Sequence, residues 1–264
     1  MNFKNKMLKA LFFRQLIWCV FALALLVFAL GISWQVSKTS SFLYGFWYQT
    51  LDIQQVINKS VPKNSQGKRD FPTDDSQLHE KKFADIVQAI HQHGDGLAEI
   101  RYVNLQGISR KLLTPSEVQH LQDVANLLDS ISHYWWGNLF LLLSLLVFYC
   151  RKLKNYTALN ARQSLIKSTR KLPTGKQKFL TLAGFVLCIA ALLGILGFTE
   201  VFYYLHTVVF PANHQWFFYY NDSLMASLMK APDIFAAIAL QLVVVALLIA
   251  AGVDSLVSRY QQKL

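Results

Sequence analysis

Four long runs of apolar residues, none of which contains a charged side chain, constrain this chain more than any other feature of its sequence. They hold 17, 17, 20 and 20 residues and occupy Leu16–Ile32, Tyr134–Cys150, Phe179–Phe198 and Ile234–Val253. A helix rises about 1.5 Å per residue and the hydrocarbon core of a bilayer is about 30 Å thick, so each run can cross a membrane. One such run could be a buried core helix, but four predict an all-α membrane protein with a four-helix transmembrane bundle.

The composition excludes two other classes of protein. Apolar residues make up 53 % of the chain, which is far too many for an intrinsically disordered protein. The net charge is +11, with 26 basic against 15 acidic residues. These basic residues flank the apolar runs instead of lining a polar face, so the sequence predicts no nucleic-acid partner.

The distribution of the basic residues predicts the orientation in the membrane. Residues 1–14, 151–178 and 255–264 together hold 15 of the 26 Lys and Arg residues and no acid. Because cytoplasmic loops are enriched in Lys and Arg, both termini and the middle loop are predicted to be cytoplasmic. The first run is longer than the ~7–15 apolar residues of a signal peptide, and no clear cleavage site follows it, so we expect an uncleaved anchor.

These observations divide the chain into nine segments. The predicted segments are a cytoplasmic N-terminus (1–14), spans at 15–33, 134–150, 179–199 and 234–254, an extracytoplasmic domain (34–133), a basic cytoplasmic loop (151–178), an extracytoplasmic aromatic segment (200–233) and a cytoplasmic tail (255–264). The domain between spans 1 and 2 is expected to be mixed α/β or mostly α. The aromatic segment is expected to lie at the membrane interface.

Local patterns predict the elements of the extracytoplasmic domain. Residues 58–76 are rich in Pro, Asn, Ser and Gly and predict a loop, whereas 77–93 have apolar residues at helical spacing. Residues 97–103 alternate weakly, as a short strand does. A second helix begins at Thr114, with Pro115 at its first position and Glu117 closing a capping box, and it is expected to continue to the second span.

Two histidines on the predicted outer side are the candidates for chemistry. His120 has Glu117 and Asp123 three residues away on either side along the helix, where a carboxylate can fix and stabilise a protonated imidazole. A solvent-exposed helix with weak ion pairs explains the same spacing. His206 follows the third run and lies among aromatic residues, a setting that also suits an ordinary interfacial histidine.

Two blocks of residues resemble the signatures of the bacterial lipoprotein intramolecular transacylase family. The first resembles E-x-x-H-M-x-D-V, with Leu121 in place of Met; the second begins with H-x-x-x-F. The matching positions are Glu117, His120, Asp123 and Val124, then His206, Phe210, Asn213, Trp216, Asp222, Leu224, Pro232 and Phe235. The four spans and two outer segments also agree with this family.

The resemblance implies a specific reaction. An enzyme of this family moves the sn-2 acyl chain of a diacylglyceryl-modified cysteine onto the α-amino group of the same cysteine, which gives a lyso-form lipoprotein. The implied partners are diacylglyceryl-modified bacterial lipoproteins and membrane lipid, with no cofactor and no metal. The implied location is the bacterial cytoplasmic (inner) membrane, with the active site on the extracytoplasmic side.

Physical chemistry suggests roles for the matched residues. The acceptor amine has a pKa of ~7.7–8, so a general base must take its proton. His206 is the candidate base, and a protonated His120 beside Asp123 is the candidate donor to the oxyanion, although the two histidines could exchange roles. Supporting or substrate-binding roles are expected for Glu117, Asn213, Trp216, Asp222 and Phe210.

Two alternatives belong to other classes of protein. A non-enzymatic accessory protein with a partner-binding outer domain would not need either histidine. A metal-dependent membrane hydrolase would use His120, His206 and Asp123 as ligands, but the sequence has no compact ligand motif. The sequence predicts neither the oligomeric state nor which lipoproteins are used.

Overall fold

The structure, a computed structural model, describes residues 3–150 and 172–263. The chain forms two compact units, which we describe separately. Unit 1 comprises Met1–Ser33, Tyr134–Leu192 and Val243–Leu264, and unit 2 comprises Trp34–His133 and Leu193–Leu242. Most of the predicted basic loop, residues 151–171, lies outside the described residues.

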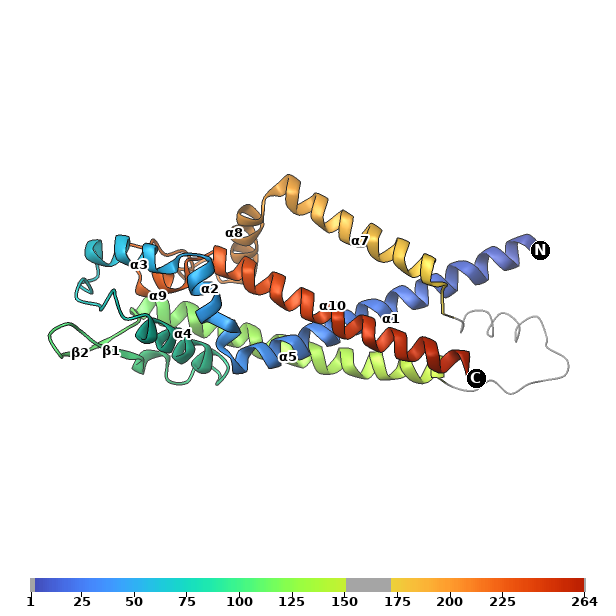
Figure 1. The fold of residues 1–264 in the computed structure, drawn as a ribbon, viewed down its shortest axis with the longest axis horizontal. Helices are drawn as coiled ribbons and strands as arrows, with labels where there is room; N and C mark the ends of the chain where they lie inside the picture. Colours follow the sequence, from blue (N-terminus) through green and yellow to red (C-terminus); the bar gives the residue numbers. More distant parts are fainter. Residues whose placement is uncertain (1–2, 151–171, 264) are drawn as a thin grey trace. The chain divides into compact units, whose positions relative to one another are not determined.

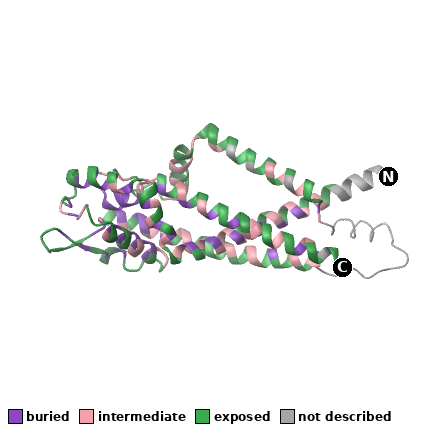
Figure 2. Cartoon of the chain, in the orientation of Figure 1, coloured by how far each residue is buried: buried purple, intermediate pink, exposed green. Residues whose placement is uncertain are grey.

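Four helices of the described chain are long and apolar enough to cross a membrane (Figure 1). They are α1 (Phe3–Thr39), α5 (Pro115–Cys150), α7 (Gly175–Leu196) and α10 (Asp233–Gln262). Their large apolar side chains are widely exposed, with Phe140, Ile195 and Leu248 at 76 %, 82 % and 70 % (Figure 2). Exposing such apolar surfaces to water is unfavourable in free energy, whereas exposing them to lipid is not. The predicted multi-pass membrane protein with four spans is therefore confirmed.

Close packing of α1 on α5 holds unit 1 together. The Trp135 indole stacks on Phe28 with ring centroids 5.4 Å apart and donates a hydrogen bond to the Phe28 carbonyl. Asn138 donates to the Ala24 carbonyl at 2.9 Å. A Cβ at Gly31 would lie 1.9 Å from the Trp135 Nε1, so the absence of a side chain at residue 31 leaves room for the indole in this position.

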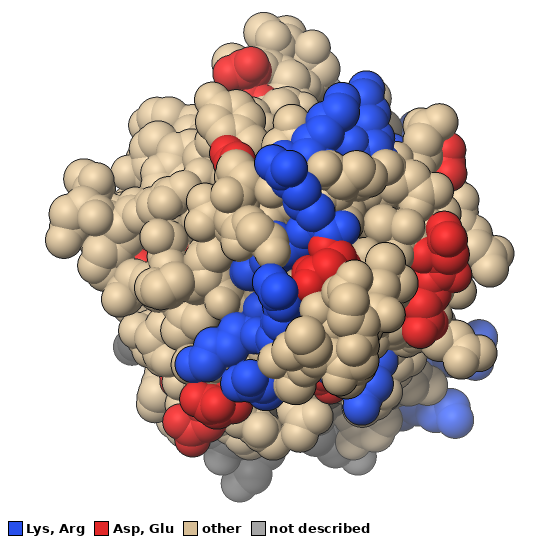
Figure 3. All heavy atoms as spheres, turned by 90° about the vertical axis from the view of Figure 1, so that its left-hand side faces the viewer, with Lys and Arg blue, Asp and Glu red and all other residues tan. Residues whose placement is uncertain are grey.

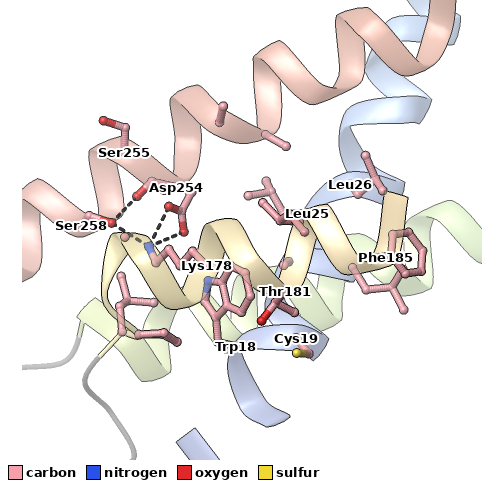
Figure 4. Close-up of a pocket in the computed structure, with 18 of the residues that line it drawn as sticks. Trp18, Cys19, Leu25, Leu26, Lys178, Thr181, Phe185, Asp254, Ser255 and Ser258 are labelled. Carbon is pink, nitrogen blue, oxygen red and sulfur yellow. Dashed lines mark hydrogen bonds and ion pairs between the residues drawn. The ribbon is translucent and has the colours of Figure 1, made fainter. Parts of the chain in front are cut away.

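A cavity of about 1040 Å³ lies in unit 1 among α1, α7 and α10 (Figure 4). Its lining is mainly apolar, and one part of it carries an ion pair. Lys178 Nζ lies 2.7 Å from Asp254 Oδ2 and donates to Ser258 Oγ at 3.0 Å. This pair satisfies two charges that would otherwise be isolated among apolar helices.

Unit 2 is mostly helical and includes one small β-hairpin. Its elements beyond the long helices are η1 (Ser41–Leu43), α2 (Tyr44–Thr50), α3 (Ile53–Ser60), η2 (Val61–Lys63), α4 (Ser76–Ile90), η3 (Leu97–Glu99), β1 (Arg101–Val103), β2 (Ser109–Lys111), α8 (Phe198–Val209) and α9 (Leu224–Met229). The strands are antiparallel, with Tyr102 opposite Arg110. Tyr44 and Phe83 stack at 4.1 Å in the core.

The local predictions for unit 2 hold in outline and differ in detail. The predicted helix at 77–93 is α4, whose N-cap Asp75 accepts from the Leu78 N–H at 2.9 Å. The loop predicted at 58–76 starts later in the structure than the sequence predicts, because α3 and η2 extend to Lys63. The predicted strand at 97–103 is β1 preceded by η3. Its partner β2 has three exposed polar residues and so no apolar alternation that could have revealed it.

Candidate functional site

His120 and His206 lie side by side in unit 2 although they are far apart in sequence. Their ring centroids are 6.1 Å apart. His120 comes from the first turns of α5 and His206 from the last turns of α8. Four aromatic rings surround them, and we call this set the histidine cluster: His120, His206, Phe202, Phe210, Trp216 and Phe218.

The predicted capping box at the start of α5 fixes the position of His120. The Thr114 N–H donates to Glu117 Oε2 at 2.5 Å, and the Glu117 N–H donates to Thr114 Oγ1 at 3.3 Å. These two bonds satisfy backbone donors that have no partner within the helix. His120 therefore lies in the second turn of a helix with a well-defined start.

Glu117 joins a buried network in addition to this cap. Its side chain is fully buried, accepts a hydrogen bond from Ser223 Oγ and lies 3.9 Å from Lys68 Nζ. Ser223 Oγ also accepts from the Ala226 N–H and so caps α9. Burial lowers the pKa of Lys68, and the Glu117 charge opposes this shift. Glu117 thus ties α5 to α9 and to the loop that carries Lys68.

We expect replacement of Glu117 with Ala to lower the free energy of unfolding by about 3–5 kcal/mol, since it leaves a buried charge without its partner. Gln in this position would still close the cap but would leave Lys68 without a counter-charge. Thermal unfolding of the purified chain in detergent measures the effect. Glu99, whose side chain is 73 % exposed, provides the control, since Glu99→Ala should change stability by only about 0.5 kcal/mol. Equal stability of the Glu117 and Glu99 variants would contradict the buried network.

The hydrogen bonding of His206 defines its tautomer. His206 Nδ1 lies 2.7 Å from the Phe202 carbonyl oxygen, one turn earlier in α8. A carbonyl oxygen can only accept, so Nδ1 carries the proton of the neutral ring and Nε2 keeps its lone pair. Burial lowers the pKa of His206, which favours this neutral form. The residue therefore presents a free basic nitrogen.

The surroundings of His120 disfavour the protonated ring that the sequence led us to expect. The first half of α5, up to His133, belongs to unit 2 and precedes the uncharged apolar run. Burial, and then the neighbouring His206, lower the pKa of His120 to about 4, although Asp123 opposes the shift. A neutral imidazole has one N–H, so His120 can still donate a single hydrogen bond.

Asp123 does not hold His120 as expected. Its Oδ2 lies 2.7 Å from His214 Nδ1, and its Oδ1 accepts from Gln119 at 3.5 Å. A residue distant in sequence therefore bonds to Asp123, while the charge of Asp123 still acts to raise the pKa of His120. His214 connects α5 with the segment that carries Trp216 and Phe218.

The other predicted residues fall into two groups. Phe210 and Trp216 belong to the histidine cluster, with centroids 5.2 and 5.3 Å from His206. Asp222 instead accepts from Ser65 Oγ at 2.6 Å and fixes a loop, and Asn213 is exposed. The side-chain contact of Asp222 is therefore a structural one, with a residue outside the cluster.

Three residues of this region have no recognisable signal in the sequence: Lys68, His214 and Ser223. Each acts through a partner that is far away along the chain, so spacing cannot reveal it. Within residues 3–150 and 172–263, no three His, Cys, Asp or Glu side chains are grouped as metal ligands. The hydrolase alternative, which needs His120, His206 and Asp123 around one ion, gains no support from this geometry.

Comparison with known proteins adds independent findings. Residues 16–231 match the family described as "Lipoprotein intramolecular transacylase Lit". The fold is similar to a solved structure of a single-residue variant of the membrane integral lipoprotein intramolecular transacylase Lit from Bacillus cereus. The TM-score is 0.60 at 14 % identity, over 99 % of this chain and 97 % of that one. A search of curated protein sequences finds no significant match.

Proposed function

Because this chain belongs to the lipoprotein intramolecular transacylase family, we propose that its histidine cluster is the site of acyl transfer. Enzymes of this family produce lyso-form lipoproteins. The proposed substrate is a lipoprotein whose N-terminal cysteine carries a diacylglyceryl group. The proposed reaction moves the sn-2 acyl chain onto the α-amino group of that cysteine.

One observation carries the assignment of roles, namely the bond between His206 Nδ1 and the Phe202 carbonyl. It leaves Nε2 free to accept the proton of the attacking amine. As the amine nitrogen bonds to the ester carbonyl carbon, this proton moves to Nε2. When the ester C–O bond breaks, Nε2 returns the proton to the departing glycerol oxygen. His206 thus takes up a proton from the amine and returns it to the leaving oxygen.

His120 is proposed to stabilise the oxyanion of the tetrahedral intermediate. Its neutral ring offers one N–H, and its burial keeps that donor away from competing water. A preorganised donor aimed at a developing charge is worth more in such a setting than in bulk water. A neutral donor also avoids placing a second positive charge beside a protonated His206.

The aromatic rings are proposed to hold the acyl chains and to limit access of water. Phe202, Phe210, Trp216 and Phe218 lie around the two histidines with ring centroids 4.2–5.9 Å away. Water that reached the tetrahedral site could hydrolyse the ester instead of allowing transfer. An apolar wall therefore favours transfer, since donor and acceptor belong to one molecule.

Mass spectrometry of a lipoprotein N-terminus tests this function. In cells that express the chain, the proposal expects the lyso form with an N-linked acyl chain, without any added cofactor. Cells lacking it should keep both ester-linked chains and a free amine. If the two samples carry the same N-terminus, the accessory-protein alternative replaces the transacylase.

The location is proposed to be a bacterial cytoplasmic membrane, with unit 2 outside. We expect a membrane-impermeant maleimide to label Gln106→Cys in whole cells and to label Ser164→Cys only after lysis. Both substitutions should be introduced into a variant that lacks the three native cysteines, Cys19, Cys150 and Cys188. Gln106 lies in the exposed turn between β1 and β2. Residue 164 belongs to the basic loop predicted from the sequence. Labelling in the opposite order would contradict the orientation.

A further inference from the structure

A second cavity, of about 470 Å³, lies in unit 2 and shares no residue with the histidine cluster. Its walls come from α3, η2, residues 219–221 and Lys230 at the end of α9. Lys59, Lys63 and Lys230 line it together with Tyr219 and Tyr220, and none of its lining residues is Asp or Glu. Its size is within the range of small-molecule sites, roughly 300–1,000 Å³.

The lysines bring positive charge to this cavity. Lys59 and Lys63 are exposed, and neither takes part in the ion pairs of the described residues. Lys230 Nζ donates to the Leu51 carbonyl at 2.5 Å and lies 3.7 Å from Asp233. Basic side chains also form a band across the face of the molecule drawn in Figure 3, with acidic side chains lying among and beside them. Because Lys230 already lies beside Asp233, the uncompensated positive charge at this cavity comes from Lys59 and Lys63, which can attract an anion to it.

Hydrogen bonds between the walls give the cavity a fixed shape. The Ser60 hydroxyl, from α3, lies 3.0 Å from that of Ser227 in α9. Ser227 Oγ also lies 2.9 Å from the Tyr220 carbonyl oxygen. The Tyr220 hydroxyl donates to the Ala231 carbonyl at 2.7 Å. The wall that bears the tyrosines is therefore tied to the helices that bear the lysines.

We propose that this cavity binds a phosphate ester of a small polyol. The lysine ammonium groups suit the phosphate, since Lys acts as a compact charge toward such anions. The amides of Gln55 and Asn221 and the Tyr219 hydroxyl offer donors and acceptors for the hydroxyl groups of the polyol. A phospholipid headgroup and a soluble ester share this chemistry. The inference does not depend on the proposed acyl transfer.

Binding to the full chain in a non-ionic detergent tests the site. The probes are glycerol 3-phosphate, inorganic phosphate, glycerol and dihexanoyl phosphatidylglycerol, measured by calorimetry at low salt. We expect saturable binding of glycerol 3-phosphate that is about tenfold weaker for each of Lys59→Gln and Lys63→Gln. Lys81→Gln removes an exposed lysine of α4 outside the cavity and should bind as the unchanged chain does.

Each result decides the question. Binding of both glycerol 3-phosphate and the short lipid, lost in the lysine variants, supports a site for a soluble or lipid-borne ester. Binding of the lipid alone, with the same loss, identifies a headgroup. Inorganic phosphate that binds as tightly as the ester, or glycerol that binds as well, overturns the assignment to a polyol phosphate. If no probe binds saturably, or if Lys81→Gln weakens binding as much as the cavity variants do, the proposal of a binding site in this cavity is wrong.

Discussion

Replacing His206 with Gln is expected to slow formation of the lyso-lipoprotein by about 10²–10⁴-fold, the range for loss of a general base. Gln is similar in size, and its amide can still donate to the Phe202 carbonyl, which accepts from His206 in the structure. Its side chain has no basic nitrogen, so the attacking amine would have to lose its proton to water. The measurement is the rate of N-acylation of a diacylglyceryl peptide by the purified chain in detergent.

His133 provides a matched control for this variant. His133 Nδ1 lies 2.7 Å from the Asp129 carbonyl oxygen, which is the same local bond one turn back along a helix. The residue is exposed and lies outside the histidine cluster. We expect His133→Gln to retain its full rate. A His206→Gln variant that remains within about threefold of the unchanged chain, well short of a tenfold loss, would remove His206 as the base.

Replacing His120 with Ala is expected to slow the reaction by about 10²–10³-fold, since an oxyanion donor is lost. The role of donor also predicts partial rescue, because His120→Asn restores an N–H without restoring a basic ring nitrogen. His206→Asn should show no such rescue. If the two histidines exchanged roles, the pattern of rescue would exchange with them. The rates come from the same N-acylation assay at matched protein concentration.

The double variant tests whether the two histidines serve one reaction step. Residues that act as a unit lose activity non-additively. The variant with both His120→Ala and His206→Gln should therefore be little slower than the slower single variant. Fully multiplicative losses would show that the residues act in separate steps.

Much of the architecture could be predicted because it depends on local sequence. Each membrane span is a continuous apolar run, and its length alone matches the bilayer. The start of α5 could be predicted for the same reason, because the capping box of Thr114 and Glu117 involves only residues three apart in sequence. The strand β2 was missed because Ser109–Lys111 is exposed on a two-stranded hairpin and so has no apolar alternation.

The site was only partly predictable because its chemistry depends on contacts between distant segments. The pairing of Asp123 with His214 changed the expected partner of that carboxylate. The lowered pKa of His120 follows from burial beside His206, which spacing along one helix cannot show. Lys68 and Ser223, likewise, are brought to Glu117 only by the folded chain.

An isotope experiment tests the central claim most directly. The purified chain would receive a diacylglyceryl peptide with a deuterated sn-2 acyl chain, mixed with a second peptide of different sequence that carries unlabelled chains. We expect the deuterated acyl chain to move to the amine of the same peptide that carried it, so that the total mass of that peptide is unchanged. Label recovered as free fatty acid would indicate a hydrolase, and label on the amine of the second peptide would contradict intramolecular transfer.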